Sequence, residues 1–148
     1  MTDNQIVEIL IVEDNPDDLE LALHALKRNH LTNHIQVARD GADALRLIYG
    51  PEPSGPAGVV HKPKVVLLDL KLPKVDGLEV LRRLKADPRT RTIPVVMLTS
   101  SREERDIVES YQLGVNSYIV KPVDFEQFVD AVQHLGLYWV LLNQPPTG

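Results

Sequence analysis

The sequence predicts an α/β fold, a doubly wound parallel sheet of five strands with helices on both faces. Five short runs rich in β-branched residues alternate with five segments whose apolar residues recur every three or four positions. Such alternation implies right-handed βαβ crossovers, which give a three-layer arrangement of helices, sheet and helices. The 148 residues suffice for one domain with its own core, and 43% hydrophobic residues are ordinary for a globular chain.

Each expected strand has the length of a buried strand and is mostly apolar, as parallel strands covered on both faces are. The five expected strands are 6–12, 34–38, 64–68, 94–98 and 116–120.

The five expected helices are marked by shared apolar faces and by residues typical of helix ends. Residues 15–17 (Asn-Pro-Asp) begin the first helix, 75–77 (Val-Asp-Gly) begin the third, 87–88 (Asp-Pro) end it, and Asp124 can cap the fifth. The apolar faces are Leu19, Ala22, Leu23 and Leu26; Ala42, Leu45 and Ile48; Val80, Leu81 and Leu84; Ile107, Val108 and Tyr111; and Phe125, Phe128, Val129, Val132 and Leu135.

We expect residues 1–148 to form a single domain, with a core over about 6–135 and a C-terminal helix extension and tail over 136–148. Residues 51–63 hold four of the 11 prolines and two of the eight glycines, so they predict a surface loop. Few residues follow the last expected helix, so no effector domain is expected after it.

Composition excludes several function classes. A net charge of -5 without a block of Lys or Arg argues against nucleic acid and against an anionic membrane surface as partners. The chain has no cysteine, its start is polar, and no apolar stretch approaches the roughly 20 residues that cross a bilayer. We therefore expect a cytoplasmic protein whose partners are proteins or small ions. The five histidines lack metal-ligand spacing and are expected at the surface or at edges.

Polar residues follow four of the expected strands. Glu13 and Asp14 come after the first strand, and Asp69 directly follows the apolar run 65–68 of the third. Thr99 follows the fourth strand, and Lys121 follows the fifth. The carboxyl ends of parallel strands form the ligand-binding edge of such a sheet, so these side chains should meet.

Three carboxylates at one edge repel each other, so either one holds a proton or a cation lies among them. A few carboxylates with room for water favour Mg²⁺, which readily adds a phosphate oxygen to its ligands. Lys121 and Thr99 can then contact phosphate oxygens. An Asp can also attack phosphorus and form an aspartyl phosphate.

Four motifs together resemble the receiver domain of two-component response regulators: ED at 13–14, LLDLKLPKVDG at 67–77, LTS at 98–100 and YIVKP at 118–122. The resemblance implies a flavodoxin-like (CheY-like) fold with strand order 2-1-3-4-5. It further implies that Asp69 is the phosphoacceptor and that Mg²⁺ binds to Asp14, to Asp69, to Glu13 through water and to the backbone carbonyl of Lys71.

The same resemblance assigns roles to four further residues. Thr99 would be the switch hydroxyl, Lys121 the phosphate-binding lysine, and Tyr118 the aromatic that turns inward on activation. Pro122 would follow a cis peptide bond that aims Lys121.

The function this resemblance implies is transfer of a phosphoryl group from a sensor histidine kinase to Asp69. The transfer would switch the face made by the fourth helix, fifth strand and fifth helix, and the chain would catalyse only its own phosphorylation and dephosphorylation. A haloacid-dehalogenase-type phosphatase is disfavoured because Lys71 stands where its second Asp is expected. Flavin or dinucleotide binding on the same fold is disfavoured because the first loop is not rich in glycine. A receiver-like module that binds partners without phosphorylation stays an alternative.

The ending of the chain is unusually apolar. Residues 137–142 are six successive apolar or aromatic residues, too many for one helical stripe to bury, so Tyr138, Trp139, Leu141 and Leu142 are expected at a homodimer or partner face. The alternative is that they cover an edge of the core. This ending and the loop 51–63 resemble stand-alone receivers paired with bacterial phytochrome histidine kinases, although another kinase pathway stays open.

Overall fold

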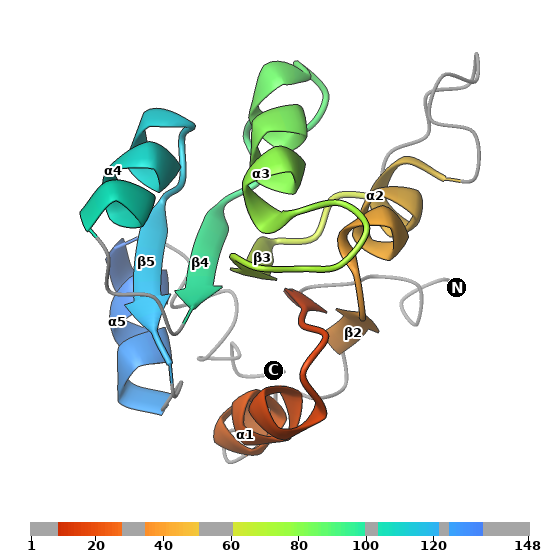
Figure 1. The fold of residues 1–148 in the computed structure, drawn as a ribbon. Helices are drawn as coiled ribbons and strands as arrows, with labels where there is room; N and C mark the ends of the chain where they lie inside the picture. Colours follow the sequence, from red (N-terminus) through yellow and green to blue (C-terminus); the bar gives the residue numbers. More distant parts are fainter. Residues whose placement is uncertain (1–8, 28–34, 51–60, 100–103, 122–124, 135–148) are drawn as a thin grey trace, which may run out of the picture.

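The computed structural model describes residues 9–27, 35–50, 61–99, 104–121 and 125–134. Within them, five strands alternate with five helices (Figure 1). The strands are β1 (Ile9–Val12), β2 (Ile35–Ala38), β3 (Val65–Asp69), β4 (Val95–Thr99) and β5 (Ser117–Val120). The helices are α1 (Pro16–Lys27), α2 (Gly41–Tyr49), α3 (Gly77–Ala86), α4 (Glu104–Gln112) and α5 (Phe125–His134).

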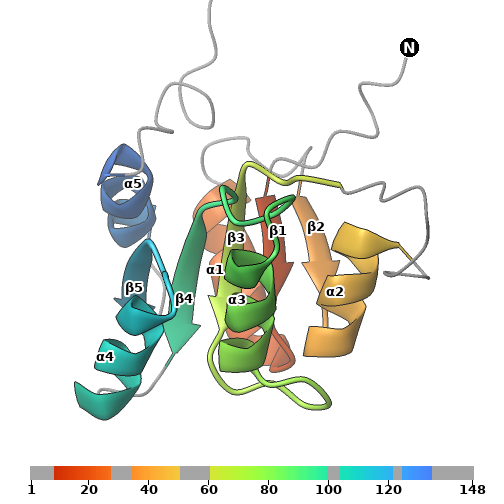
Figure 2. The same cartoon turned by 90° about the horizontal axis from the view of Figure 1, so that it is seen from above.

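All five strands form one parallel sheet in the order β2-β1-β3-β4-β5. The arrowheads of neighbouring strands point the same way in Figure 2. The fold class and the strand order that the resemblance implied are therefore confirmed. From the middle of the sheet, the chain proceeds from β1 to β2 toward one edge and from β3 through β4 to β5 toward the other. The carboxyl ends of β1 and β3 therefore flank the topological switch point.

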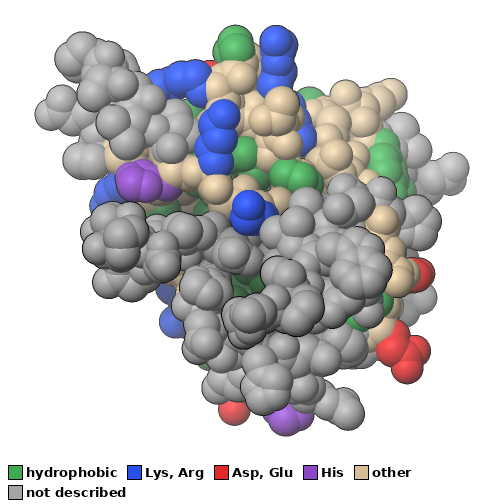
Figure 3. Space-filling view, turned by 180° about the vertical axis from the view of Figure 1, so that it is seen from behind, with side chains coloured by type: hydrophobic (Ala, Val, Ile, Leu, Met, Phe, Trp, Pro, Cys, Tyr) green, Lys and Arg blue, Asp and Glu red, His purple; other side chains and the backbone are tan. Residues whose placement is uncertain are grey.

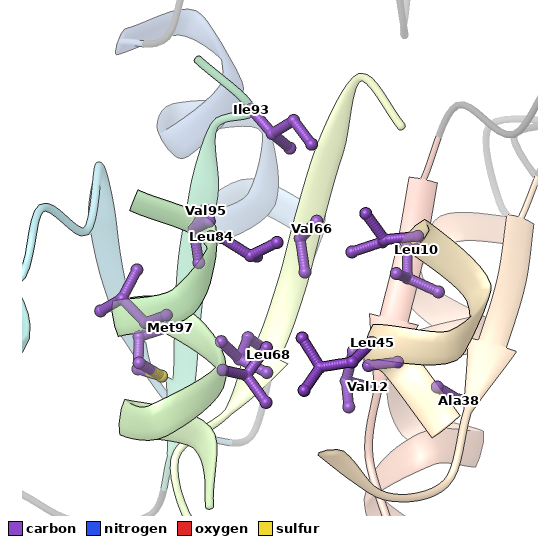
Figure 4. Close-up of a cluster of buried hydrophobic side chains, with 14 of the residues drawn as sticks. Leu10, Val12, Ala38, Leu45, Val66, Leu68, Leu84, Ile93, Val95 and Met97 are labelled. Carbon is purple, nitrogen blue, oxygen red and sulfur yellow. The ribbon is translucent and has the colours of Figure 1, made fainter. Parts of the chain in front are cut away.

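Helices cover both faces of the sheet. In Figure 2, α2, α3 and α4 lie on one face, and α1 and α5 lie on the other. Alternate strand residues point to opposite faces, so Leu10 and Val12 pack into the cluster beneath α2 and α3, whereas Ile9 and Ile11 pack against α1 and α5. The first of these two cores is drawn in Figure 4.

Helix α1 begins at the residues expected from the sequence, and α2 begins after Asp40, a cap that was not predicted. Asn15 Oδ1 accepts hydrogen bonds from the amides of Asp17 and Asp18, and the side chain of Asp40 accepts one from the Asp43 amide. Asp76 stands at the N-cap of α3 but makes no capping hydrogen bond through its side chain.

Two expectations needed correction. Strands β3 and β4 each run one residue further than expected, because the Leu70 amide donates to the Leu98 carbonyl at 3.0 Å and prolongs the ladder past Asp69. Tyr111, expected on an apolar helix face with Ile107 and Val108, is 51% exposed. Its hydroxyl allows it to face water.

The side chain of Lys85 links elements at the amino-terminal edge of the sheet. The Lys85 ammonium donates to the Arg91 and Ile93 carbonyls and to Asn116 Oδ1, which links α3 to the starts of β4 and β5. Figure 3, seen from behind, shows Lys and Arg side chains gathered on this face. Of the histidines, His24 and His61 are exposed as expected. No helix in the described ranges is long and apolar enough to span a bilayer.

Candidate functional site

The carboxyl edge of the sheet brings together the polar residues that follow the strands. Glu13 comes directly after β1, Asp69 is the last residue of β3, and Lys121 comes directly after β5. Asp69 pairs in register with Leu98 of β4, whose next residue, Thr99, pairs with Val120. The strand ends thus place these positions at one edge, as the sequence predicts.

Lys121 is the centre of an ion-pair network at this edge. Its ammonium Nζ lies 2.7 Å from Glu13 Oε1, 2.9 Å from Asp18 Oδ2 and 3.4 Å from Asp69 Oδ1. Burial by itself lowers the pKa of Lys121, but the hydrogen bonds to Glu13 and Asp18 and the nearby negative charges raise it above its ordinary value. Lys121 therefore stays a cation.

Asp69 is a buried carboxylate with too few positive neighbours. Only 6% of the residue is exposed. Burial, followed by the hydrogen bond and the negative charge of Glu13, raises the pKa of Asp69 to about 7, although Lys121 opposes the shift. A second cation at this point would remove the cost of ionising Asp69.

Three carboxylates are placed to hold such a cation. Glu13, Asp14 and Asp69 each offer an oxygen, and these oxygens lie within 4.8 Å of one another. Glu13 and Asp69 are buried, whereas Asp14 is exposed and leaves room for water. An all-oxygen donor set of this kind suits a hard divalent cation.

The loop after β3 is held tightly against the sheet. The Gly77 amide donates to the Leu70 carbonyl at 3.0 Å, and a Cβ at Gly77 would overlap the backbone oxygens of Asp69 and Leu70. Lys74 within this loop has a positive φ of 68°, and its ammonium lies 3.5 Å from Asp40 Oδ2. This loop holds the backbone on the carboxyl side of Asp69 in place.

Residues 9–133 match the family model of the response regulator receiver domain. The chain belongs to this family. The match spans every described strand and helix except the last residue of α5.

Three proteins place this receiver among its relatives. The probable methanogenesis regulatory protein FilR2 of Methanothrix harundinacea is 42% identical over 138 residues, which is 93% of this chain and 86% of FilR2. The structure of the bacteriophytochrome response regulator AtBRR is 55% identical, covers 94% of this chain and 99% of its own, and has a TM-score of 0.76.

The third relative is the response regulator Rcp1 of Synechocystis, 36% identical over 132 residues, which is 89% of this chain and 88% of Rcp1. The crystal structure of its Mn(2+)-bound form covers 94% of this chain and 96% of its own, with 34% identity and a TM-score of 0.70. A divalent metal has thus been observed in a relative of this receiver.

Several residues singled out from the sequence lie partly or wholly outside the described part of the receiver. The backbone of Thr99 ends β4, but its side chain is outside the description, as are Pro122 and the residues Tyr138, Trp139, Leu141 and Leu142. Lys71 is exposed two residues after Asp69, and Tyr118 of β5 is partly buried against the core cluster that also holds Met97.

One residue at the site was not anticipated from the sequence. Asp18 contacts Lys121 across 103 positions of sequence, and no receiver motif includes it. The sequence contained part of the information needed to predict this contact, because Asp18 lies in the first turn of a helix that starts beside the carboxyl edge of the sheet.

Proposed function

We propose that this chain is a cytoplasmic response regulator that accepts a phosphoryl group from a sensor histidine kinase onto Asp69, with Mg²⁺ as the cofactor. The observation that carries the proposal is the buried carboxylate of Asp69 between Lys121 and the acidic pair Glu13 and Asp14. It is a phosphoacceptor rather than an enzyme with a separate substrate, and it catalyses only its own phosphorylation and dephosphorylation.

The transfer is a nucleophilic displacement at phosphorus. An ionised oxygen of Asp69 attacks the phosphorus of the kinase phosphohistidine, a P–O bond forms, and the P–N bond breaks with its electron pair returning to the imidazole. Lys121 offers its ammonium to the phosphoryl oxygens, with the Thr99 hydroxyl as a second partner.

Glu13, Asp14, Asp69 and the backbone carbonyl of Lys71 are the proposed holders of Mg²⁺. When bound, the cation neutralises negative charge on the carboxylates and on the phosphoryl oxygens. The oxygens of the three side chains fit this assignment because they lie within 4.8 Å of one another.

A test of the proposal is to incubate the chain with acetyl phosphate and Mg²⁺ and to weigh it intact. The parent chain is expected to gain one phosphoryl group, and the Asp69→Asn variant to gain none. Asp76→Asn, which changes an exposed carboxylate seven residues later, serves as the control and should be phosphorylated like the parent. A phosphoryl gain on Asp69→Asn would refute the assignment.

The proposed output is a change in the face formed by α4, β5 and α5. Tyr118 lines a groove of about 510 Å³ on this face, together with residues of α4 and α5 that include Tyr111, Gln127 and Ala131. The groove borders the ring whose position the proposed switch changes. In that switch, Thr99 moves toward the phosphoryl group and Tyr118 turns inward.

The proposed input is a bacterial phytochrome kinase. Support comes from AtBRR, which is described as a bacteriophytochrome response regulator and is 55% identical over nearly the full length of both chains. A kinase of another pathway would phosphorylate Asp69 in the same way, because the residues around Asp69 do not determine which kinase binds.

We also propose a homodimer formed through the α4/β5/α5 face and the apolar run 137–142. Removing residues after Gly136 is expected to halve the solution mass at high protein concentration, measured by light scattering, because apolar surface drives such association. If the full chain and the shortened chain are both monomers at high concentration, the dimer proposal is wrong.

A further inference from the structure

Asp18 occupies a position at the site that neither the metal ligands nor the phosphoacceptor explains. Its Oδ2 lies 2.9 Å from Lys121 Nζ, and the two side chains are 34% and 11% exposed. Charge-assisted hydrogen bonds of this length are the stronger kind. Asp18 is therefore a real partner of Lys121 in the unphosphorylated chain.

The backbone holds Asp18 in this place. The Asn15 side chain accepts hydrogen bonds from the Asp17 and Asp18 amides at 2.9 and 3.1 Å, and Pro16 is the first residue of α1. The next residue, Leu19, is buried in the core with 9% exposure. Because the cap and the core anchor both fix the first turn of α1, Asp18 faces the end of β5 without needing Lys121 to hold it there.

The contacts of Lys121 are unequal. Its ammonium is 2.7 Å from Glu13 and 2.9 Å from Asp18, but 3.4 Å from Asp69, the reaction centre. An ammonium has three hydrogens to give, and two of its three close contacts are to carboxylates other than the phosphoacceptor. Glu13 is also a proposed metal ligand, so Asp18 is the carboxylate in this network with no other role.

We propose that Asp18 is a positioning residue that holds Lys121 back from the phosphoryl group and so slows phosphorylation of the chain. The inference rests on the proposed function, because it concerns transfer to Asp69. Transfer converts a monoanionic carboxylate to a dianionic acyl phosphate, and the phosphoryl oxygens then compete with Asp18 for the ammonium.

The experiment is phosphorylation of the full chain by acetyl phosphate and Mg²⁺, followed over time by intact mass. Asp18→Asn is expected to raise the rate constant about fivefold, which is the size expected for losing one partly exposed ion pair. Asp17→Asn is the matched control, since Asp17 lies in the same helical turn and Lys121 does not pair with it. Its rate should stay within about twofold of the parent.

Two further measurements separate positioning from a general effect of charge or folding. With Lys121→Ala as the background, Asp18→Asn should no longer change the rate, because the coupling between the two residues is gone. The ¹⁵N signal of the Lys121 ammonium should shift in Asp18→Asn and not in Asp17→Asn, in samples whose thermal unfolding matches the parent. A rate increase that persists without Lys121, or an unchanged ammonium signal, overturns the inference.

The two proposals fail in different ways. If the parent gains no phosphoryl mass, the assignment of Asp69 fails. If the parent is phosphorylated and Asp18→Asn is no faster than Asp17→Asn, only the role of Asp18 fails.

Discussion

At about pH 8 and without divalent metal, the Asp69→Asn variant is expected to unfold at a higher urea concentration than the parent chain. Asp69 is buried with 6% exposure, and burial together with Glu13 raises its pKa to about 7. Ionising it in the folded chain is therefore costly, and an amide of the same shape avoids this cost. The proposed function gives a reason for this cost, because a carboxylate can accept the phosphoryl group and an amide cannot.

The sign of the pH dependence follows from proton binding. The ordinary pKa of Asp is 3.8, so between about pH 4 and pH 7 the folded chain binds more protons at Asp69 than the unfolded chain does. Stability contributed by this group is present below that range and is lost as pH rises through about 7. The full difference is on the order of 4 kcal/mol, and Asp69→Asn should recover about 2 kcal/mol because it also gives up the attraction to Lys121.

Urea unfolding at about pH 5 and pH 8, with a metal chelator, measures this effect. The gain of Asp69→Asn over the parent should grow with pH, while Asp76→Asn, at an exposed position, should change stability by no more than about 0.5 kcal/mol at either pH. Added Mg²⁺ should stabilise the parent more than Asp69→Asn. Equal stability of parent and Asp69→Asn at both pH values would contradict the buried-charge interpretation.

Gly77→Ala is expected to destabilise the chain by about 3 kcal/mol and to reduce phosphorylation of Asp69. A Cβ at Gly77 would overlap the backbone oxygens of Asp69 and Leu70, which are not free to move because they belong to the sheet and to the loop that follows it. The start of α3 must then separate from the end of β3. This displacement moves the backbone that positions Asp69, the proposed phosphoacceptor.

Gly50→Ala provides a matched comparison, because Gly50 has a positive φ of 86° but open space around it. With a ψ of 176°, Gly50 adopts a conformation almost confined to glycine, so the cost should be about 2 kcal/mol, from backbone conformation alone. Urea unfolding and the rate of phosphoryl gain from acetyl phosphate together check the pair. Equal losses at the two glycines would show that the contact between α3 and β3 is not what constrains Gly77.

Most of the fold was predictable because local patterns and topology agree. Runs such as 65–68 are apolar throughout and lie in a strand covered on both faces, and the alternation with helices requires crossovers of one hand. The strand order was available only through the motifs around Asp69 and Lys121. The alternation of strands and helices indicates that the strands are parallel, but it does not show which strands are neighbours.

The site was predictable only where it follows strand ends. Glu13, Asp69 and Lys121 each stand directly at a strand terminus, so topology alone brings them to one edge. Asp18 stands on a helix, and its contact depends on how α1 lies beside the end of β5, which no local pattern encodes. The prediction that Tyr111 shares an apolar helix face was wrong, because helical spacing predicts which residues share a face but not how far that face extends over the sheet.

The hydrogen bond from the Leu70 amide to the Leu98 carbonyl has a consequence for how the chain can respond to a signal. Asp69 is enclosed by the ladder between β3 and β4 instead of standing at its frayed end, so its backbone has little amplitude of motion on the timescale of a switch. Under the proposed function, movement must then come from the side chains that gather around Asp69, with Lys121 among them. The Leu70 amide should exchange its hydrogen with solvent as slowly in the signalling state as in the resting state.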